Sequence, residues 1–193
     1  MIELIPESYV ARLDLEKIFG RAAPLHVDLG CGDGSFLCAL AERHPNKNFL
    51  GIERMSERVG KACRRARTLE NVRVLHLETS YAIRYLFPES SVSVFYLLFP
   101  DPWPKRRHHR RRIITSAFLD AIHTALFEEG LLKVATDQLD YFHQIMLLSG
   151  GKSGLTVSKP DDVDLPLSKF ERRFREAGAP IYRSVLRKTS PVT

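Results

Sequence analysis

A glycine-rich turn between a strand-like segment and a helical segment most constrains how this chain can fold. Residues 25–29 are mostly apolar, residues 30–34 read GCGDG, and residues 35–43 have helical periodicity. Glycine has no Cβ atom and tolerates a positive φ, so such a turn lets the backbone approach a ligand closely. A strand, a glycine turn and a helix in this order predict a parallel α/β sheet with its ligand above the strand ends.

The turn supplies candidate ligand-binding residues, namely Gly30, Gly32, Gly34 and the preceding Asp28. A dinucleotide-binding fingerprint would read G-x-G-x-x-G, but Ser35 occupies the place of its third glycine. The D-x-G-x-G-x-G pattern instead resembles the first motif of S-adenosylmethionine-dependent methyltransferases. Glycine turns of this kind also occur after strands for purely structural reasons.

The next segments again alternate between strand and helix. We predict strands over residues 48–53, 72–77 and 92–99, with helices over 56–68 and 82–87. Glu53 ends the first of these strands, where an acid in a doubly wound sheet binds ribose hydroxyls. The same residue is also suited to beginning the next helix, because a negative charge is favourable there. After the following strand, Glu78, Thr79 or Ser80 would border an adenine.

The segment 99–112 (FPDPWPKRRHHRRR) follows the last of these strands. Prolines at positions 100, 102 and 104 disfavour the α region at the residues before them, so we expect Asp101 and Trp103 to lie on a stiff extended segment. The sequence is compatible with Trp103 either stacking on a base or only wedging the turn. A carboxylate and a large aromatic ring would thus lie beside the glycine turn.

A cluster of basic residues completes this segment. Residues 105–112 contain six Lys or Arg residues and no acid, and the whole chain has a net charge of +6, so the remainder sums to zero. A positive charge concentrated in one place is typical of a nucleic-acid-binding surface rather than of an ordinary solvated face. The candidate contacts are Lys105, Arg106, Arg107, His108, Arg110, Arg111 and Arg112.

The rest of the chain extends the same architecture. We predict a helix over 116–128 ended by Gly130, a strand over 131–135 followed by Asp137, and a final strand over 181–186. Residues 1–24 are expected to form a short covering helix, and residues 25–193 a single domain. No apolar run approaches membrane-spanning length, so we expect a cytoplasmic protein. The three cysteines lack C-x-x-C spacing, which argues against both disulfides and a metal site.

Taken together, these motifs resemble the bacterial tRNA (guanine-N7)-methyltransferase family. The resemblance rests on residues 28–34, 51–53, 99–112, 135–137 and 168–171, and the run FPDPWPK is its most specific part. It implies a Rossmann-like class I methyltransferase fold, with a seven-stranded, mostly parallel sheet, helices on both faces and a C-terminal antiparallel strand. It also implies S-adenosylmethionine as methyl donor and a variable-loop guanosine of tRNA, at position 46, as acceptor.

The same resemblance assigns roles to individual residues. It implies cofactor contacts at Asp28, Glu53, Glu78 and Asp101, with catalysis centred on Asp101. The tRNA contacts that it implies are Lys105, Asp137, Ser168, Lys169, Phe170 and Glu171.

Three other functions are alternatives to methylation of guanine. Amino methyltransferases that act on adenine carry Asp/Asn-Pro-Pro-aromatic at this place, whereas here the order is Asp-Pro-Trp-Pro. A nicotinamide-dependent oxidoreductase is disfavoured by Ser35. A non-catalytic RNA-binding module would explain the basic residues but would leave the glycine turn and Glu53 without a role.

Overall fold

A computed structural model describes residues 1–149, 154–158 and 165–189 of the chain. The strands are β1 (Glu3–Leu4), β2 (Leu25–Leu29), β3 (Asn48–Glu53), β4 (Val72–His76), β5 (Val92–Leu98), β6 (Leu126–Thr136), β7 (Leu155–Ser158) and β8 (Tyr182–Lys188). The helices are α1 (Leu15–Phe19), α2 (Ser35–Arg43), α3 (Ser56–Arg65), α4 (Thr79–Leu86), the 3₁₀ helix η1 (Arg106–Arg111), α5 (Ser116–Ala125), α6 (Leu139–Ser149) and α7 (Lys169–Glu176).

The strands form one mostly parallel sheet, which confirms the predicted α/β architecture. Their order is β1-β4-β3-β2-β5-β6-β8-β7, and β8 runs antiparallel to both of its neighbours. Successive strands extend the sheet in one direction from β2 to β4 and in the other from β5 to β6. The carboxyl ends of β2 and β5 therefore lie at a topological switch point, where open α/β sheets bind their ligands.

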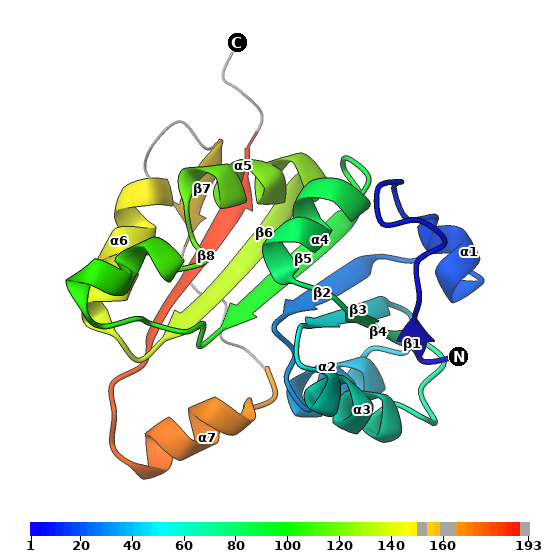
Figure 1. The fold of residues 1–193 in the computed structure, drawn as a ribbon, viewed down its shortest axis with the longest axis horizontal. Coiled ribbons are helices and arrows are strands. Elements are labelled where there is room, and N and C mark those ends of the chain that lie inside the picture. Colours follow the sequence, from blue (N-terminus) through cyan, green and yellow to red (C-terminus); the bar gives the residue numbers. More distant parts are fainter. Residues whose placement is uncertain (150–153, 159–164, 190–193) are drawn as a thin grey trace.

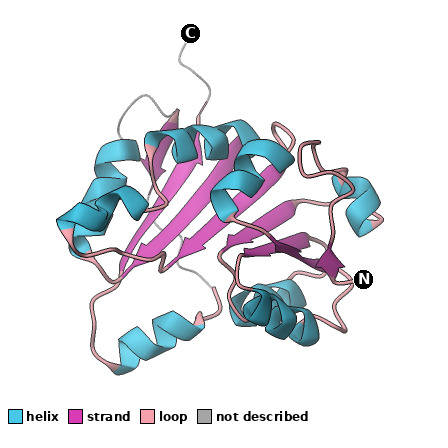
Figure 2. Ribbon diagram, in the orientation of Figure 1, coloured by secondary structure: helices cyan, strands magenta, loops and turns pink. Residues whose placement is uncertain are grey.

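Helices cover both faces of the sheet (Figures 1 and 2). One apolar cluster packs α1, α4, α5 and α6 against the strands, and a second packs α2 and α3 against the other face. The strands β2 and β3 are buried along their whole length, as expected for the centre of a parallel sheet. Helix α7 lies apart from these layers, below the sheet in Figure 1.

Two differences from the sequence predictions depend on pairing between strands. The sheet has eight described strands rather than seven, because residues 3 and 4 pair in parallel with Val74 and Leu75. The helix predicted over 116–128 ends at Ala125, and Leu126 already pairs with Val92 at the start of β6. Glu129 has a φ of 62°, which no α-helix accommodates, so Gly130 lies within a strand rather than ending a helix.

Candidate active site

The glycine turn after β2 presents open backbone to solvent. Gly30 and Gly32 have φ values of 81° and 57°, and a Cβ atom added at either would meet nothing within 4 Å. The amide of Gly30 donates to the carbonyl of Ile52 at 2.9 Å, and the amide of Gly32 donates to the carboxylate of Glu53 at 3.1 Å. Bonds to the end of β3 therefore fix a turn that leaves space for a ligand.

Gly34 has a different role from the one expected. It also has a positive φ, 74°, but a Cβ atom there would lie 3.0 Å from the Cα atom of Ala62 in α3. Gly34 is the N-cap of α2 and lines neither of the two cavities described below. The structure thus gives Gly34 a packing role between two helices, and its contact with a cofactor stays a prediction.

Two buried carboxylates lie beneath the turn. Glu53 is 4% exposed and accepts from the amides of Gly32 and Met55, the latter at 2.9 Å. Asp28 is equally buried, and desolvation together with the nearby charge of Glu53 raises the pKa of Asp28 to about 7. A positively charged or hydrogen-bond-donating ligand would satisfy these carboxylates, because buried charges are costly without partners.

The end of β4 contributes the third polar group. Glu78 is the N-cap of α4 and accepts from the amides of Ser80 and Tyr81 at 2.9 and 2.7 Å. Glu78, Thr79 and Ser80 all line the same cavity, and the contact of one of them with an adenine stays a prediction. The capping bonds fix the Glu78 carboxylate at the cavity wall.

Two adjoining cavities occupy the carboxyl edge of the sheet. The first, of about 650 Å³, is lined by Glu53, Glu78, Asp101 and Trp103 among others. The second, of about 460 Å³, is lined by residues that include Asp28, Gly32, Ser168, Lys169 and Phe170. Four residues line both cavities: Gly30, Arg58, Leu98 and Phe170. Each cavity is of the size that small-molecule sites usually have, and together they connect the glycine turn with the segment after β5.

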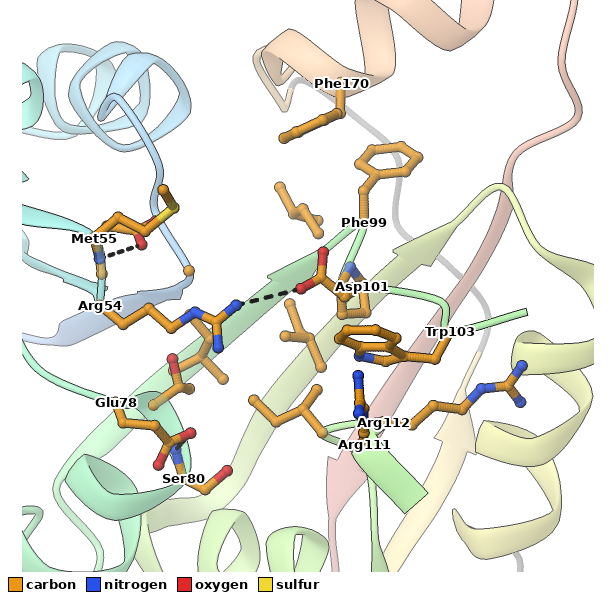
Figure 3. A pocket seen from close by; sticks show the side chains of 18 of the residues that line it. Arg54, Met55, Glu78, Ser80, Phe99, Asp101, Trp103, Arg111, Arg112 and Phe170 are labelled. Atoms are coloured by element: carbon orange, nitrogen blue, oxygen red, sulfur yellow. Dashed lines mark hydrogen bonds and ion pairs between the residues drawn. The ribbon is translucent and has the colours of Figure 1, made fainter. Parts of the chain in front are cut away.

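Asp101 projects into the first cavity (Figure 3). Its side chain is 70% exposed, and its carboxylate faces the guanidinium of Arg54, with Oδ2 and Nη2 3.7 Å apart. The segment is not extended throughout, contrary to prediction, because Phe99 and Trp103 have φ values of 53° and 42°. The prolines do keep Trp103 out of the right-handed helical region, but its backbone adopts the left-handed one instead.

The basic segment divides into an exposed part and a buried part. We define the basic surface as the solvent-exposed residues Lys105, Arg106, Arg107, Arg110 and Arg111. They lie on or beside η1, and Arg111 also lines the first cavity. The partly buried His108 packs its ring against Trp103, with the ring centres 5.9 Å apart. The predicted surface is therefore present next to the cavity, without Arg112.

Arg112 lines the first cavity but its side chain is buried, so it lies outside the exposed basic surface, and its contact with tRNA stays a prediction. Its side chain is only 2% exposed and donates to the carbonyl of Pro102 at 2.8 Å and to Gln144 at 2.7 Å. It also pairs with Asp140, whose pKa this hydrogen bond lowers, and its guanidinium lies over the ring of Tyr141. Arg112 thus ties the segment that carries Asp101 to helix α6.

The predicted tRNA contacts near the C-terminus also separate into two kinds. Ser168 is the buried N-cap of α7, and its hydroxyl accepts from the amide of Glu171 at 3.1 Å. Glu171 is buried and pairs with Arg183 and Arg175, so both Ser168 and Glu171 stabilise the helix, and Ser168 also lines the second cavity. Lys169 and Phe170 are exposed and line the second cavity.

Asp137 lies outside both cavities. It follows β6, is half-buried, and accepts from the side chain of Gln138 at 2.6 Å. The structure therefore does not bring Asp137 together with Asp101 and Glu53.

Two cations that line the first cavity, Arg54 and Arg58, were not predicted from the sequence. Arg54 and Arg58 follow the carboxyl end of β3, and Arg58 lies 3.9 Å from Glu53. Their position just after an expected ligand-binding strand was the available signal. Among the described residues, no group of three or more His, Cys, Asp or Glu side chains could hold a metal ion. In the same part of the chain, no helix is long and apolar enough to cross a membrane.

Solved structures of methyltransferases share this fold. The 16S rRNA methyltransferase KamB aligns over 93% of this chain and 95% of its own, with a TM-score of 0.66 and 16% identity. A SAM-dependent methyltransferase from Aquifex aeolicus aligns over 91% of this chain and 88% of its own, with a TM-score of 0.61 and 15% identity. At these identities the likeness shows the fold alone.

Sequence comparison is more specific. A family model described as a putative methyltransferase matches residues 22–184. The tRNA (guanine-N(7)-)-methyltransferase of Leifsonia xyli subsp. xyli is 38% identical over 88% of this chain and 78% of its own length. The enzyme of the same name from Halorhodospira halophila is 36% identical over 95% of this chain and 82% of its own. The chain therefore belongs to the tRNA (guanine-N(7)-)-methyltransferase family.

Proposed function

We propose that this protein transfers a methyl group from S-adenosylmethionine to N7 of a guanosine in tRNA. The observation that carries the proposal is the joining of three features at one sheet edge: the open glycine turn, the cavity that contains Asp101, and the basic surface. Membership of the family supports the same reaction. We assign the acceptor to the variable-loop guanosine at position 46, as the sequence motifs imply, and the protein to the cytoplasm, where tRNA is found.

The glycine turn and the two buried carboxylates fit the proposed methyl donor. The space above Gly30 and Gly32, where Cβ atoms would otherwise stand, accommodates a ligand in close contact with the backbone. Glu53 can accept from ribose hydroxyls, and Asp28, which lines the second cavity, can accept from an ammonium group. When bound, S-adenosylmethionine supplies a methyl group attached to a positively charged sulfur.

Asp101 suits the recognition of guanine. Its carboxylate oxygens can accept hydrogen bonds from guanine N1–H and N2–H, which adenine cannot offer in the same arrangement. Guanine N7 has an in-plane lone pair and no proton, so the reaction needs no general base. Alignment of N7 with the methyl group then supplies most of the rate enhancement. A fixed carboxylate stabilises the positive charge that develops on the purine.

The basic surface suits the rest of the tRNA. Lys and Arg side chains there neutralise backbone phosphates without reading sequence. In A-form RNA, N7 lies in a deep and narrow major groove that side chains cannot read, so the acceptor must be in a loop or turned out of its stack. A guanosine in the variable loop meets this requirement.

Incubation with methyl-labelled donor and bulk tRNA, followed by mapping of the modified base, tests the proposal. Label at N7 of a single guanosine is expected, whereas label on an adenine amino group would favour the rival reaction. In Asp101→Asn, turnover should fall on the order of a hundredfold, the scale for losing one preorganised electrostatic contact, with donor affinity retained. Asp120→Asn, a matched change at an exposed position on α5, should leave turnover unaltered. Normal turnover in Asp101→Asn would contradict the role of this carboxylate.

A further inference from the structure

The indole of Trp103 lies in a fixed orientation at the first cavity. The ring, the chain's single tryptophan, lines this cavity together with Asp101 and Glu53. The guanidinium of Arg111 covers one face, 4.9 Å from the ring centre. In Figure 3 the ring lies between Arg111 and Asp101. His108 packs at 89° to the ring and is not among the residues that line the cavity.

The backbone at Trp103 is strained in a way that packing around it must maintain. A φ of 42° is unusual for so bulky a residue, and such strain persists only where the surroundings impose it. Here Pro102 and Pro104 bracket the residue, and buried Arg112 holds the Pro102 carbonyl at 2.8 Å. Strain of this kind at the wall of a cavity points to a role for the side chain in that cavity.

The chemistry of the proposed reaction gives such a ring a specific task. A bond forms between guanine N7 and the methyl carbon as the carbon–sulfur bond breaks, and the electron pair of that bond stays on sulfur. One unit of positive charge therefore passes to the purine. The face of an indole attracts a cation more strongly than it attracts a neutral ring. A purine stacked on Trp103 would be held more tightly as methylation proceeds.

We infer that Trp103 stacks on the target guanine and stabilises the positive charge that methylation places on it. This inference rests on the proposed function. Since the contact strengthens between substrate and transition state, it contributes to catalysis and not only to binding. It also means that methylated tRNA dissociates more slowly than unmethylated tRNA.

The test compares the affinities of Trp103 variants for one tRNA in its unmethylated and N7-methylated forms. The wild-type protein should prefer the methylated form, and Trp103→Leu should reduce the preference by roughly 2- to 30-fold, the range of a cation–π contact. Trp103→Phe, which keeps a weaker aromatic face, should give an intermediate preference. Arg110→Ala removes an exposed cation of the basic surface. It should lower the affinity for unmethylated and methylated tRNA by the same factor.

An unchanged preference in folded Trp103→Leu would overturn the inference. If that variant does not fold, as judged by circular dichroism, an unchanged preference in Trp103→Phe overturns it in the same way. The methylated tRNA is prepared with the wild-type protein, so the two proposals fail separately. Absence of N7 methylation would overturn the proposed function and this inference together, whereas an active enzyme with an unchanged preference would overturn only the inference.

Discussion

Replacement of Arg112 by methionine should destabilise the protein by about 3 kcal/mol. Methionine retains much of the apolar contact with Tyr141 but removes every hydrogen bond of the guanidinium. Arg112 donates to Pro102, Gln144 and Asp140 from a side chain that is 2% exposed. A typical hydrogen bond contributes about 1 kcal/mol net, so the loss of three gives about 3 kcal/mol.

The solvent exposure of Asp140, the ion-pair partner of Arg112, decides how large the loss of stability should be. Breaking a buried ion pair costs about 3–5 kcal/mol when the remaining charge stays buried. The side chain of Asp140 is 52% exposed, so water can solvate it after the change, and the lower end of the range applies. For a domain of this size, the loss corresponds to a melting temperature lower by about 6–12 °C.

The neighbouring arginine provides a matched control. Arg111 is exposed and its guanidinium contacts only the Trp103 ring among the interactions described, so Arg111→Met should cost less than about 1 kcal/mol. Urea unfolding followed by circular dichroism measures the free energy of unfolding of both variants. Their affinities for tRNA are compared well below either melting temperature. Equal losses of stability in the two variants, or wild-type stability in Arg112→Met, would refute the reasoning.

Three further predictions concern the basic surface, a buried acid and the glycine turn. Arg110→Ala should reduce the slope of log affinity for tRNA against log salt concentration by about 0.7–0.9; an unaltered slope would mean that this residue touches no phosphate. Asp28 has a folded-state pKa raised from 3.8 to about 7, so its neutral form favours folding at low pH. Stability relative to Asp28→Asn should therefore fall by roughly 4 kcal/mol between about pH 4 and pH 7, and then level off. If the free energies of unfolding of the wild-type protein and of Asp28→Asn changed in parallel with pH, this prediction would be contradicted. Gly34→Ala should lower the melting temperature through its contact with Ala62, whereas Gly30→Ala should mainly weaken donor binding measured by calorimetry; the opposite ranking would argue against these two roles.

The strand-and-helix framework could be predicted from sequence because it depends on local pattern. The apolar runs that became β2, β3 and β5 are bounded by glycine, acid and proline residues. Parallel strands leave their carboxyl ends at one edge, so Glu53 and Asp101 could be expected to line a common cavity, as they do. The short strand β1 and the early end of α5 could not be predicted in this way, because both depend on pairing with distant residues, Val74 and Val92.

Sequence by itself determined that this chain forms a doubly wound sheet with a glycine turn, and that its excess positive charge follows Asp101. Only the tertiary structure decided which members of those motifs are exposed and which are packed against other elements. Arg111 and Arg112 are adjacent and chemically identical, yet one lies at the surface and the other is buried against α6. Similarly, Gly30 opens onto the cavity while Gly34 packs against α3. The reason is physical: burial depends on what distant segments place around a residue, and neither residue type nor spacing records that.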